Sequence, residues 1–196
     1  GFGQVTARMP ELVCAEADEV VANWRTELFY FQDDVFPVWA KGWVDNFVKH
    51  WNGTPFHIQI RAEMIHDDLI KKLKAVGLHG VTFAVESGVE RIRKEILNRK
   101  MSNEQIIEAA RILRKNGIRF RIENMMGVLD ETFEDTLETL RLNIKCKPDL
   151  AWASLWQPYP GTELGDEAIG RWLFNPESDE IGFDFFHDTI LTGKES

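Results

Sequence analysis

The feature that most constrains this chain is a regular alternation of short strand-like runs with longer segments of helical periodicity. Apolar or alternating runs typical of β-strands occupy five places: 28–32, 56–61, 80–85, 119–126 and 150–157. The strand starts are separated by about 24 to 39 residues, which is enough for one strand, one helix and two loops. Repeated βα units predict an α/β fold with a parallel sheet, either doubly wound or part of a TIM-type (β/α) barrel.

The segments between the strands place apolar residues at helical spacing, so one face of each helix is expected to contact the core. The residues that form these faces are Leu69, Ile70, Leu73 and Val76; Ile106, Ala110 and Leu113; and Phe133, Leu137, Leu140 and Ile144. Ser102 followed by Gln105 predicts a capping box at the start of one helix. Pro10 suits the first turn of an opening helix over 11–24.

Composition and charge exclude several classes of protein. The 196 residues are 44% apolar and 28% charged, as in ordinary globular proteins, and no run of 18 apolar residues is present. The net charge of −9 argues against general nucleic-acid binding and against docking on anionic lipid, so neither nucleic acid nor membrane is expected as a partner. Cys14 and Cys146 cannot form a disulfide framework, which favours a reducing, cytoplasmic location.

The pattern divides the chain into two parts. We expect one α/β domain over 1–170, and an irregular C-terminal extension over 171–196 that packs its aromatic residues on the domain. Those aromatic residues are Phe183, Phe185 and Phe186.

Two of the predicted strands are unusually polar for a parallel sheet, whose strands are normally apolar on both faces. The polar residues, which share one face of each strand, are His57, Gln59 and Arg61 on one and Arg119, Arg121 and Glu123 on the other. One interpretation is that these are edge strands with a solvated face. The other is a barrel whose interior holds a polar ligand in place of a packed core.

The carboxyl ends of the five strands also carry polar or glycine-containing sequence. Ligands of parallel α/β folds bind at this edge of the sheet, so these residues are the candidate ligand-binding set. They are Gln32, Asp33 and Asp34; Arg61; Glu86, Ser87 and Gly88; Asn124, Met126 and Gly127; and Gln157.

An ordered series of short motifs carries a family resemblance that spans about residues 8–168. The motifs are the segment 29–36, Arg61-Ala62, the segment 73–77 leading into 83–88, Lys100, Gly117-Ile118, Met126-Gly127 with Glu131-Thr132, and the segment 158–163. This order resembles the radical S-adenosylmethionine (SAM) enzymes, and most closely the branch with a cobalamin-binding domain. The resemblance implies a partial (β/α) barrel that holds SAM and a 4Fe-4S cluster and generates a 5′-deoxyadenosyl radical.

The sequence departs from the family pattern at the cluster. The CxxxCxxC loop that supplies three thiolates is absent, and the five expected strands are one fewer than the family's six. We therefore expect a partial barrel that lacks its first βα unit and is cut from a longer parent protein. The parent protein would carry the cluster and, if it belongs to this branch, would also bind cobalamin. Such a chain would be inactive alone, would need the missing N-terminal region as its partner, and would act there on a small-molecule substrate by methyl transfer, cyclisation or rearrangement.

The resemblance also implies roles for the candidate residues. Gln32, Asp33 and Asp34 would lie beside the SAM amino group, and Arg61 would bind the carboxylate of SAM or of a substrate. The segment 86–88 would approach the ribose or carboxylate, and Asn124, Met126 and Gly127 the adenine. Each residue also has a structural alternative: a helix N-cap for the aspartates, an ion pair with Glu63, Glu86 or Glu123 for Arg61, a turn for 86–88, and core packing for the methionines.

Two other classes of function stay open. The first is a degenerate barrel that binds an adenosyl group or another polar ligand without catalysis. The second is an unrelated (β/α) enzyme that uses Asp33, Asp34 and Glu86 as acid–base groups or as ligands of a hard cation. The five histidines show no metal-ligand spacing, so no metal site is predicted, and no residue is assigned a catalytic role.

Overall fold

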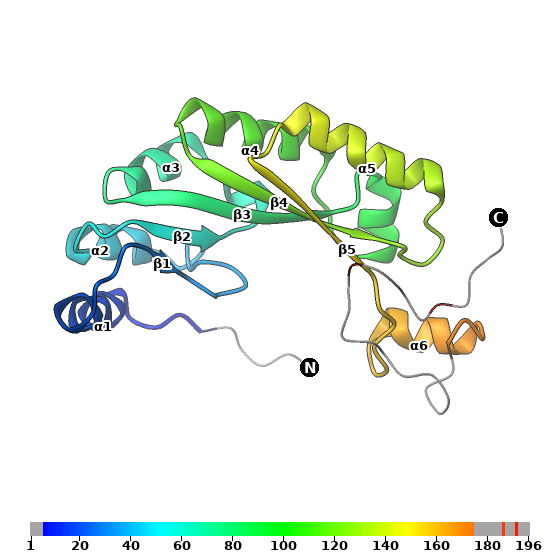
Figure 1. Cartoon of the computed structure of the whole chain (residues 1–196), viewed down its shortest axis with the longest axis horizontal. Helices are drawn as coiled ribbons and strands as arrows, with labels where there is room; N and C mark the ends of the chain where they lie inside the picture. Colours follow the sequence, from blue (N-terminus) through cyan, green and yellow to red (C-terminus); the bar gives the residue numbers. More distant parts are fainter. Residues whose placement is uncertain (1–5, 175–185, 187–190, 192–196) are drawn as a thin grey trace.

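The computed structural model describes residues 6–174 together with Phe186 and Leu191. Its centre is a sheet of five parallel strands in the order β1-β2-β3-β4-β5. The strands are β1 (Phe29–Tyr30), β2 (Phe56–Gln59), β3 (Leu78–Glu86), β4 (Arg119–Met126) and β5 (Leu150–Leu155). The strand order never reverses, so the sheet is not doubly wound; it curls into a half-barrel (Figure 1). The predicted α/β partial barrel is confirmed.

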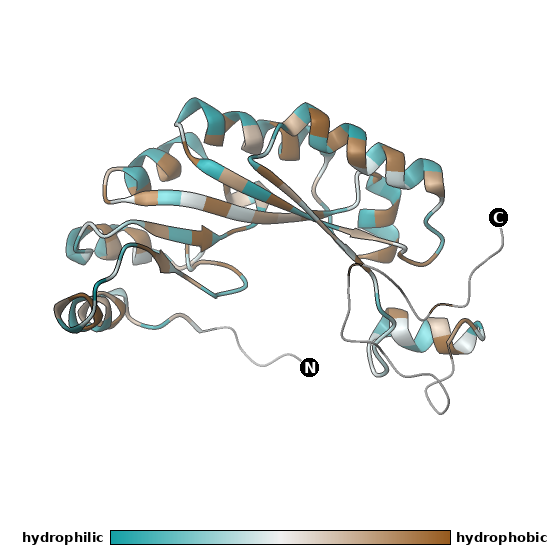
Figure 2. Cartoon of the chain, viewed as in Figure 1, coloured by the Kyte–Doolittle hydropathy of each residue, from teal (hydrophilic) through white to brown (hydrophobic). Residues whose placement is uncertain are grey.

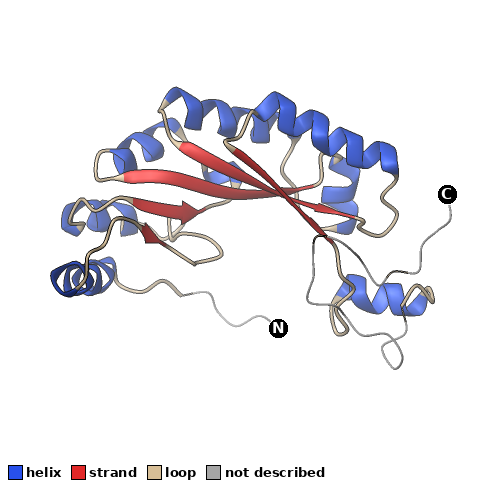
Figure 3. Ribbon diagram, viewed as in Figure 1, coloured by secondary structure: helices blue, strands red, loops and turns tan. Residues whose placement is uncertain are grey.

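The helices are α1 (Pro10–Asn23), α2 (Trp43–His50), α3 (Asp67–Lys74), α4 (Asn103–Lys115), α5 (Phe133–Cys146) and α6 (Glu163–Gly170), with a short 3-10 helix η1 (Ala62–Met64) and a π-helix η2 (Ile92–Ile96). Four of these helices, α2 to α5, lie along the convex side of the sheet, whereas α1 lies beside β1 and α6 follows the end of β5 (Figure 3). The predicted capping box of Ser102 and Gln105 opens α4. No helix in the described part of the chain is both long and apolar enough to span a membrane.

The main core fills the space between the sheet and the helices. Alternation along the strands sends one set of side chains to this layer, and the helices contribute Ile70, Leu73, Ile106 and Leu113. The strand residues of the core include Phe56, Ile58, Val81, Phe83, Phe120 and Ile122, all 0–2% exposed. In β2, β3 and β4 the apolar half of the strand is used on the convex side, so the polar half is left for the opposite, concave side. Figure 2 shows hydrophilic and hydrophobic residues alternating along the strands.

The interpretation of the polar strands as edge strands is wrong. Each of β2 and β4 lies between two neighbours in the sheet. The structure agrees with the other interpretation, because Gln59, Arg61 and Glu123 line one cleft of the concave side. Three strands are shorter than predicted, and β2 ends at Gln59, which places Arg61 in the following connection.

The predicted core face of α5 is also wrong. Phe133 is 78% exposed, Leu140 53% and Ile144 62%, whereas the buried face is formed by Thr139, Leu142, Asn143 and Cys146. Specific polar contacts fix this orientation: Thr139 Oγ1 accepts a hydrogen bond from the Gly88 N–H at 2.8 Å, and Asn143 Nδ2 donates to Asn124 Oδ1 at 2.9 Å. An unpaired buried amide costs more than an exposed apolar side chain, so the polar face of α5 turns inward.

Candidate functional site

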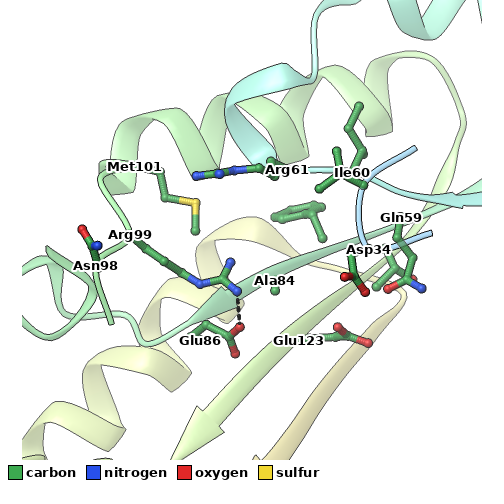
Figure 4. A pocket seen from close by; sticks show the side chains of 13 residues that line it. Asp34, Gln59, Ile60, Arg61, Ala84, Glu86, Asn98, Arg99, Met101 and Glu123 are labelled. Carbon is green, nitrogen blue, oxygen red and sulfur yellow. Dashed lines mark ion pairs between the residues drawn. The ribbon is translucent and has the colours of Figure 1, made fainter. Parts of the chain in front are cut away.

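The carboxyl ends of the strands surround a cleft of about 710 Å³ on the concave side. This volume is in the range of small-ligand sites. We call it the upper cleft; it is lined by Asp34, Val35, Gln59, Ile60, Arg61, Thr82, Phe83, Ala84, Glu86, Asn98, Arg99, Met101 and Glu123 (Figure 4). The lining comes from the ends of four successive strands and from loop 97–101, which connects η2 to α4.

Glu86 ends β3 in an unusual backbone conformation. Its φ is +67°, and the pairing of β3 with β4 shifts between Ala84 and Glu86. Positive φ is costly for a residue with a side chain, so the surrounding contacts must impose it. The carboxylate is largely buried and lies 2.8 Å from Arg99 Nη2. Burial raises the pKa of Glu86 above its ordinary value, Arg99 opposes this rise, and Glu123 adds to it.

Loop 97–101 is held in place by a fully buried arginine of the π-helix. Arg93 donates through Nη1 to the Ser87 carbonyl at 2.5 Å, through Nε and Nη2 to the Met101 carbonyl at 3.3 Å, and through Nη2 to Asn103 Oδ1 at 2.6 Å. One guanidinium thus joins the end of β3 to both the end of the loop and the start of α4. The Glu86–Arg99 pair joins the same two segments, the end of β3 and loop 97–101 (Figure 4).

The other charged residues of the upper cleft come from neighbouring strand ends. Arg61 pairs with Glu63 at 2.6 Å but is half exposed, so its guanidinium has donors left for a ligand. Glu123 pairs with Arg121, and Asp34 follows β1. The lining holds three carboxylates, Asp34, Glu86 and Glu123, against two guanidiniums, Arg61 and Arg99. Such a site can bind ammonium or hydroxyl groups through the acids and a carboxylate through the arginines.

Three of the predicted site residues, Asp34, Arg61 and Glu86, lie together in the upper cleft. Gln32 and Asp33 instead line a separate groove of about 450 Å³ between α1 and β1. The alternative in which the aspartates cap the next helix is excluded, because the N-cap of α2 is Gly42.

The remaining predicted residues make contacts within the fold. The Ser87 carbonyl accepts from Arg93, and a Cβ on Gly88 would lie 2.5 Å from backbone atoms of α5. Asn124 is 3% exposed, and its Nδ2 donates to the Trp152 carbonyl at 2.9 Å. The Gly127 N–H donates to Glu131 Oε2.

The last two predicted positions lie away from the upper cleft. Met126 is a half-buried residue at the end of β4. Gln157 is 5% exposed and lines a third hollow, beside Leu97 and Met125.

The sequence reasoning missed the residues that loop 97–101 adds to the upper cleft: Asn98, Arg99 and Met101. It singled out the neighbouring Lys100, which is exposed. The spacing of the residues does not predict a π-helix, and the position of the loop depends on tertiary contacts such as those of Arg93 with Ser87 and Met101. Gln59 and Glu123 were part of the polar faces, and Thr82 on the central strand carried no signal of its own.

The cysteines of this chain do not fit an iron–sulfur cluster. Cys14 on α1 and Cys146 on α5 are both buried among the helices, and burial raises the pKa of each thiol to about 11. Within the part of the chain that the structure describes, no three His, Cys, Asp or Glu side chains form a group able to hold a metal ion. Neither thiol lines the upper cleft.

Comparison with protein families identifies the class. Residues 2–142 match the model of the radical SAM superfamily, and the chain therefore belongs to that superfamily.

Two similar proteins show how far this relationship extends. An uncharacterized methyltransferase of Pyrococcus horikoshii is 31% identical over 111 residues, which cover 57% of this chain and 24% of the relative. The anaerobic magnesium-protoporphyrin IX monomethyl ester cyclase of Rubrivivax gelatinosus is 24% identical over 165 residues, which cover 82% of this chain and 30% of the cyclase. The chain thus spans less than a third of the length of either relative.

The fold resembles solved radical SAM structures. The methyltransferase TsrM of Kitasatospora setae, solved with cobalamin and a 4Fe-4S cluster bound, has a TM-score of 0.70 with this chain at 16% identity. The match covers 84% of this chain and 32% of TsrM. At this identity the likeness establishes the shared half-barrel fold.

Proposed function

We propose that the upper cleft binds SAM, and that this chain supplies the SAM-binding part of an enzyme that generates a 5′-deoxyadenosyl radical. The observation that carries the proposal is the meeting of Asp34, Arg61, Glu86 and Arg99 at the carboxyl ends of the sheet, in a chain of the radical SAM superfamily. Ligands of parallel α/β folds bind at this edge.

The charges of the upper cleft complement those of SAM. SAM carries an ammonium, a sulfonium and a carboxylate, a net charge of +1, and the lining has one more carboxylate than guanidinium. Asp34 suits the ammonium, Arg61 or Arg99 the carboxylate, and Glu86 the ribose hydroxyls. The ion pair with Arg99 holds the largely buried carboxylate of Glu86 in one orientation before any ligand arrives. The other predicted residues do not line the upper cleft. They would contact SAM only from the groove beside α1, from the hollow beside Gln157, or through their backbone groups.

The cluster chemistry requires thiolates that this chain does not hold in its site. We therefore propose that residues outside this chain provide the cluster ligands in the working enzyme. A small-molecule substrate, reacting by methyl transfer, cyclisation or rearrangement, and use of cobalamin belong to this proposal. They rest on the activities for which the methyltransferase and cyclase relatives are named and on the cobalamin bound to TsrM.

One observation favours a second candidate function. The sequence holds only two cysteines, and both are buried. A barrel that binds an adenosyl ligand without catalysis needs the same polar cleft and no cluster.

Equilibrium binding of SAM to the chain, measured by titration calorimetry without iron, tests the proposal. We expect binding, and a loss of about tenfold or more in affinity for Asp34→Asn and for Glu86→Gln, because each substitution removes a charge-assisted hydrogen bond. Asp45→Asn on the outer face of α2 is the matched control and should bind like the unmodified chain. The proposal fails if the folded chain does not bind SAM, or if Asp34→Asn and Glu86→Gln bind as Asp45→Asn does.

An experiment on the longest natural protein that contains this chain distinguishes the two candidate functions. After anaerobic reconstitution with iron and sulfide, SAM cleavage supports the radical enzyme. Binding without cleavage supports the non-catalytic barrel.

A further inference from the structure

The concave side of the sheet holds a second cleft, at the amino-terminal ends of the strands. We call it the lower cleft; its volume is about 290 Å³. The polar residues in its lining are Tyr30, His57, His79, Thr82, Arg119, Arg121 and Asp149. Thr82 also lines the upper cleft, so the two clefts are neighbours along one polar face of β3.

The lower cleft is positively charged in a chain of net charge −9. Arg119 and Arg121 are alternate residues of β4 and project from the same face, with their Cα atoms about 6.6 Å apart along the strand. Arg119 forms no ion pair with any residue of the described structure. The only carboxylate in the lining, Asp149, accepts the Phe120 N–H at 2.9 Å.

Arg121 is held in a fixed position yet keeps an unused donor. Its guanidinium carbon lies 5.4 Å from the centre of the Trp152 ring, and its Nη2 pairs with Glu123. Its Nε is buried and has no hydrogen-bond partner in the described structure. A buried N–H without an acceptor costs on the order of 1–3 kcal/mol. The unpaired Nε of Arg121 therefore indicates that a ligand supplies the missing acceptor.

An aromatic wall faces the two arginines. The rings of Tyr30 and His57 stack with centroids 4.4 Å apart, and His57 Nε2 lies 2.8 Å from Thr82 Oγ1. The stacked position of His57 requires a glycine at position 80, because a Cβ there would lie 2.4 Å from His57 Nδ1. The wall is therefore built by residues of three different strands.

We propose that the lower cleft is a second ligand site, which binds the anionic group of a small molecule, a carboxylate or a phosphate, between Arg119 and Arg121. Guanidiniums bind both anions through paired N–H donors, and two of them on one face oppose any cationic ligand. The site is distinct from the upper cleft, because neither Arg119 nor Arg121 lines that cleft. The two sites touch through Thr82 and through the ion pair of Arg121 with Glu123, whereas Arg119 has no contact of this kind with the upper cleft in the described part of the chain.

His57 provides a reporter inside the lower cleft. Burial, together with the positive charges of Arg121 on β4 and His79 on β3, lowers the pKa of His57 to about 4, and burial is the largest of these causes. Asp149 and Arg119 are the other charged residues of the lining. An anion bound between the arginines cancels part of this positive field, so it should raise the pKa of His57.

The experiment follows the imidazole resonances of the ¹⁵N-labelled 196-residue chain against pH in three salts of equal ionic strength: chloride, inorganic phosphate and trifluoroacetate, a carboxylate that stays ionised where His57 titrates. We expect phosphate, trifluoroacetate or both to raise the pKa of His57 by about one unit relative to chloride. A response to phosphate alone assigns a phosphate ligand, and a response to trifluoroacetate alone assigns a carboxylate.

Variants locate the effect. Arg119→Gln and Arg121→Gln should abolish the anion-dependent shift, whereas Arg111→Gln, an equal change of charge on the exposed face of α4, should retain it. Arg119 is exposed and pairs with no acid in the described structure, so Arg119→Gln should fold even if Arg121→Gln does not. The inference is overturned if neither anion moves the pKa of His57, or if Arg119→Gln keeps the full shift. SAM affinity measured in Arg119→Gln separates this result from the upper cleft, since it should be unchanged.

Discussion

The role assigned to Arg93 gives a prediction whose size follows from the structure. Arg93→Met keeps an unbranched side chain of similar reach in the π-helix and removes the guanidinium. The carbonyls of Ser87 and Met101 then lose a charged donor while remaining in a buried region. Each lost bond to a charged group costs about 1.5–3 kcal/mol. Burial lowers the pKa of Arg93, which records a desolvation cost that the substitution removes. We expect a net loss of about 3 kcal/mol in the free energy of unfolding.

The same substitution should weaken the upper cleft. Without the guanidinium, loop 97–101 loses its side-chain bonds to Ser87 at the end of β3, so Arg99 is held less firmly against Glu86. SAM affinity should therefore fall in Arg93→Met even under conditions where the variant remains folded. Arg93→Lys retains one positive donor group, so its losses in unfolding free energy and in SAM affinity should both be smaller.

Urea unfolding followed by circular dichroism measures the stability, and calorimetry measures the SAM affinity. Arg111→Met is the matched control, because Arg111 is exposed on α4 and forms a surface ion pair with Glu108 of the same helix. Its unfolding midpoint should stay at the value of the unmodified chain. If Arg93→Met were as stable as Arg111→Met and bound SAM equally well, the reasoning about loop 97–101 would be refuted.

Three further predictions concern single residues. Gly88→Ala should destabilise the chain by about 2 kcal/mol in urea unfolding, because its Cβ would lie 2.5 Å from the α5 backbone. Gly170→Ala, whose Cβ would have no atom within 4 Å, should leave the stability unchanged. Equal effects of the two substitutions would contradict the packing role of Gly88. The imidazole of His57 should titrate near pH 4 in chloride by NMR, and because its pKa is lowered on folding, stability should fall as the pH drops from about 6.5 to 4, a fall that His57→Gln should reduce. Because burial raises the pKa of Glu86, the stability of the unmodified chain should fall relative to that of Glu86→Gln as the pH rises above 4.5. If the difference between the two unfolding free energies stayed constant with pH, the result would count against a buried carboxylate at this position.

The sequence predicts the repeating part of the fold well, because that part follows from local periodicity. The bounds of β4 are those expected from its alternation, and the capping box at Ser102 forms as predicted. The concave, polar side of β2 and β4 could also be foreseen, since period two separates His57 and Gln59 from the apolar residues between them.

The orientation of α5 shows where local periodicity is insufficient. Its apolar stripe at Phe133, Leu140 and Ile144 faces outward because contacts with residues far away in the chain decide which face turns inward. The bonds from Gly88 to Thr139 and between Asn124 and Asn143 join residues 51 and 19 positions apart, and no helical window contains them. The same applies to Gly88 and Asn124, which were predicted as ligand residues and prove to be the partners of α5.

The upper cleft could be predicted in part for a similar reason. Asp34, Arg61 and Glu86 follow strands directly, so the rule that strand ends meet at one edge brings them together. Arg99 belongs to a connection between η2 and α4, and its position depends on the buried guanidinium of Arg93. A tertiary contact of this kind has no signature in the spacing of the residues.

The central claim is that SAM binds at the carboxyl ends of the strands, and mapping its site by NMR tests this claim most directly. Titration of SAM into the ¹⁵N-labelled chain should shift the backbone amides of Asp34, Arg61, Glu86 and Arg99 together, with one dissociation constant. The amides of Arg119 and of the outer helix α3 should keep their positions. Shifts confined to any other surface, or no shifts at saturating SAM in the folded chain, would contradict the account.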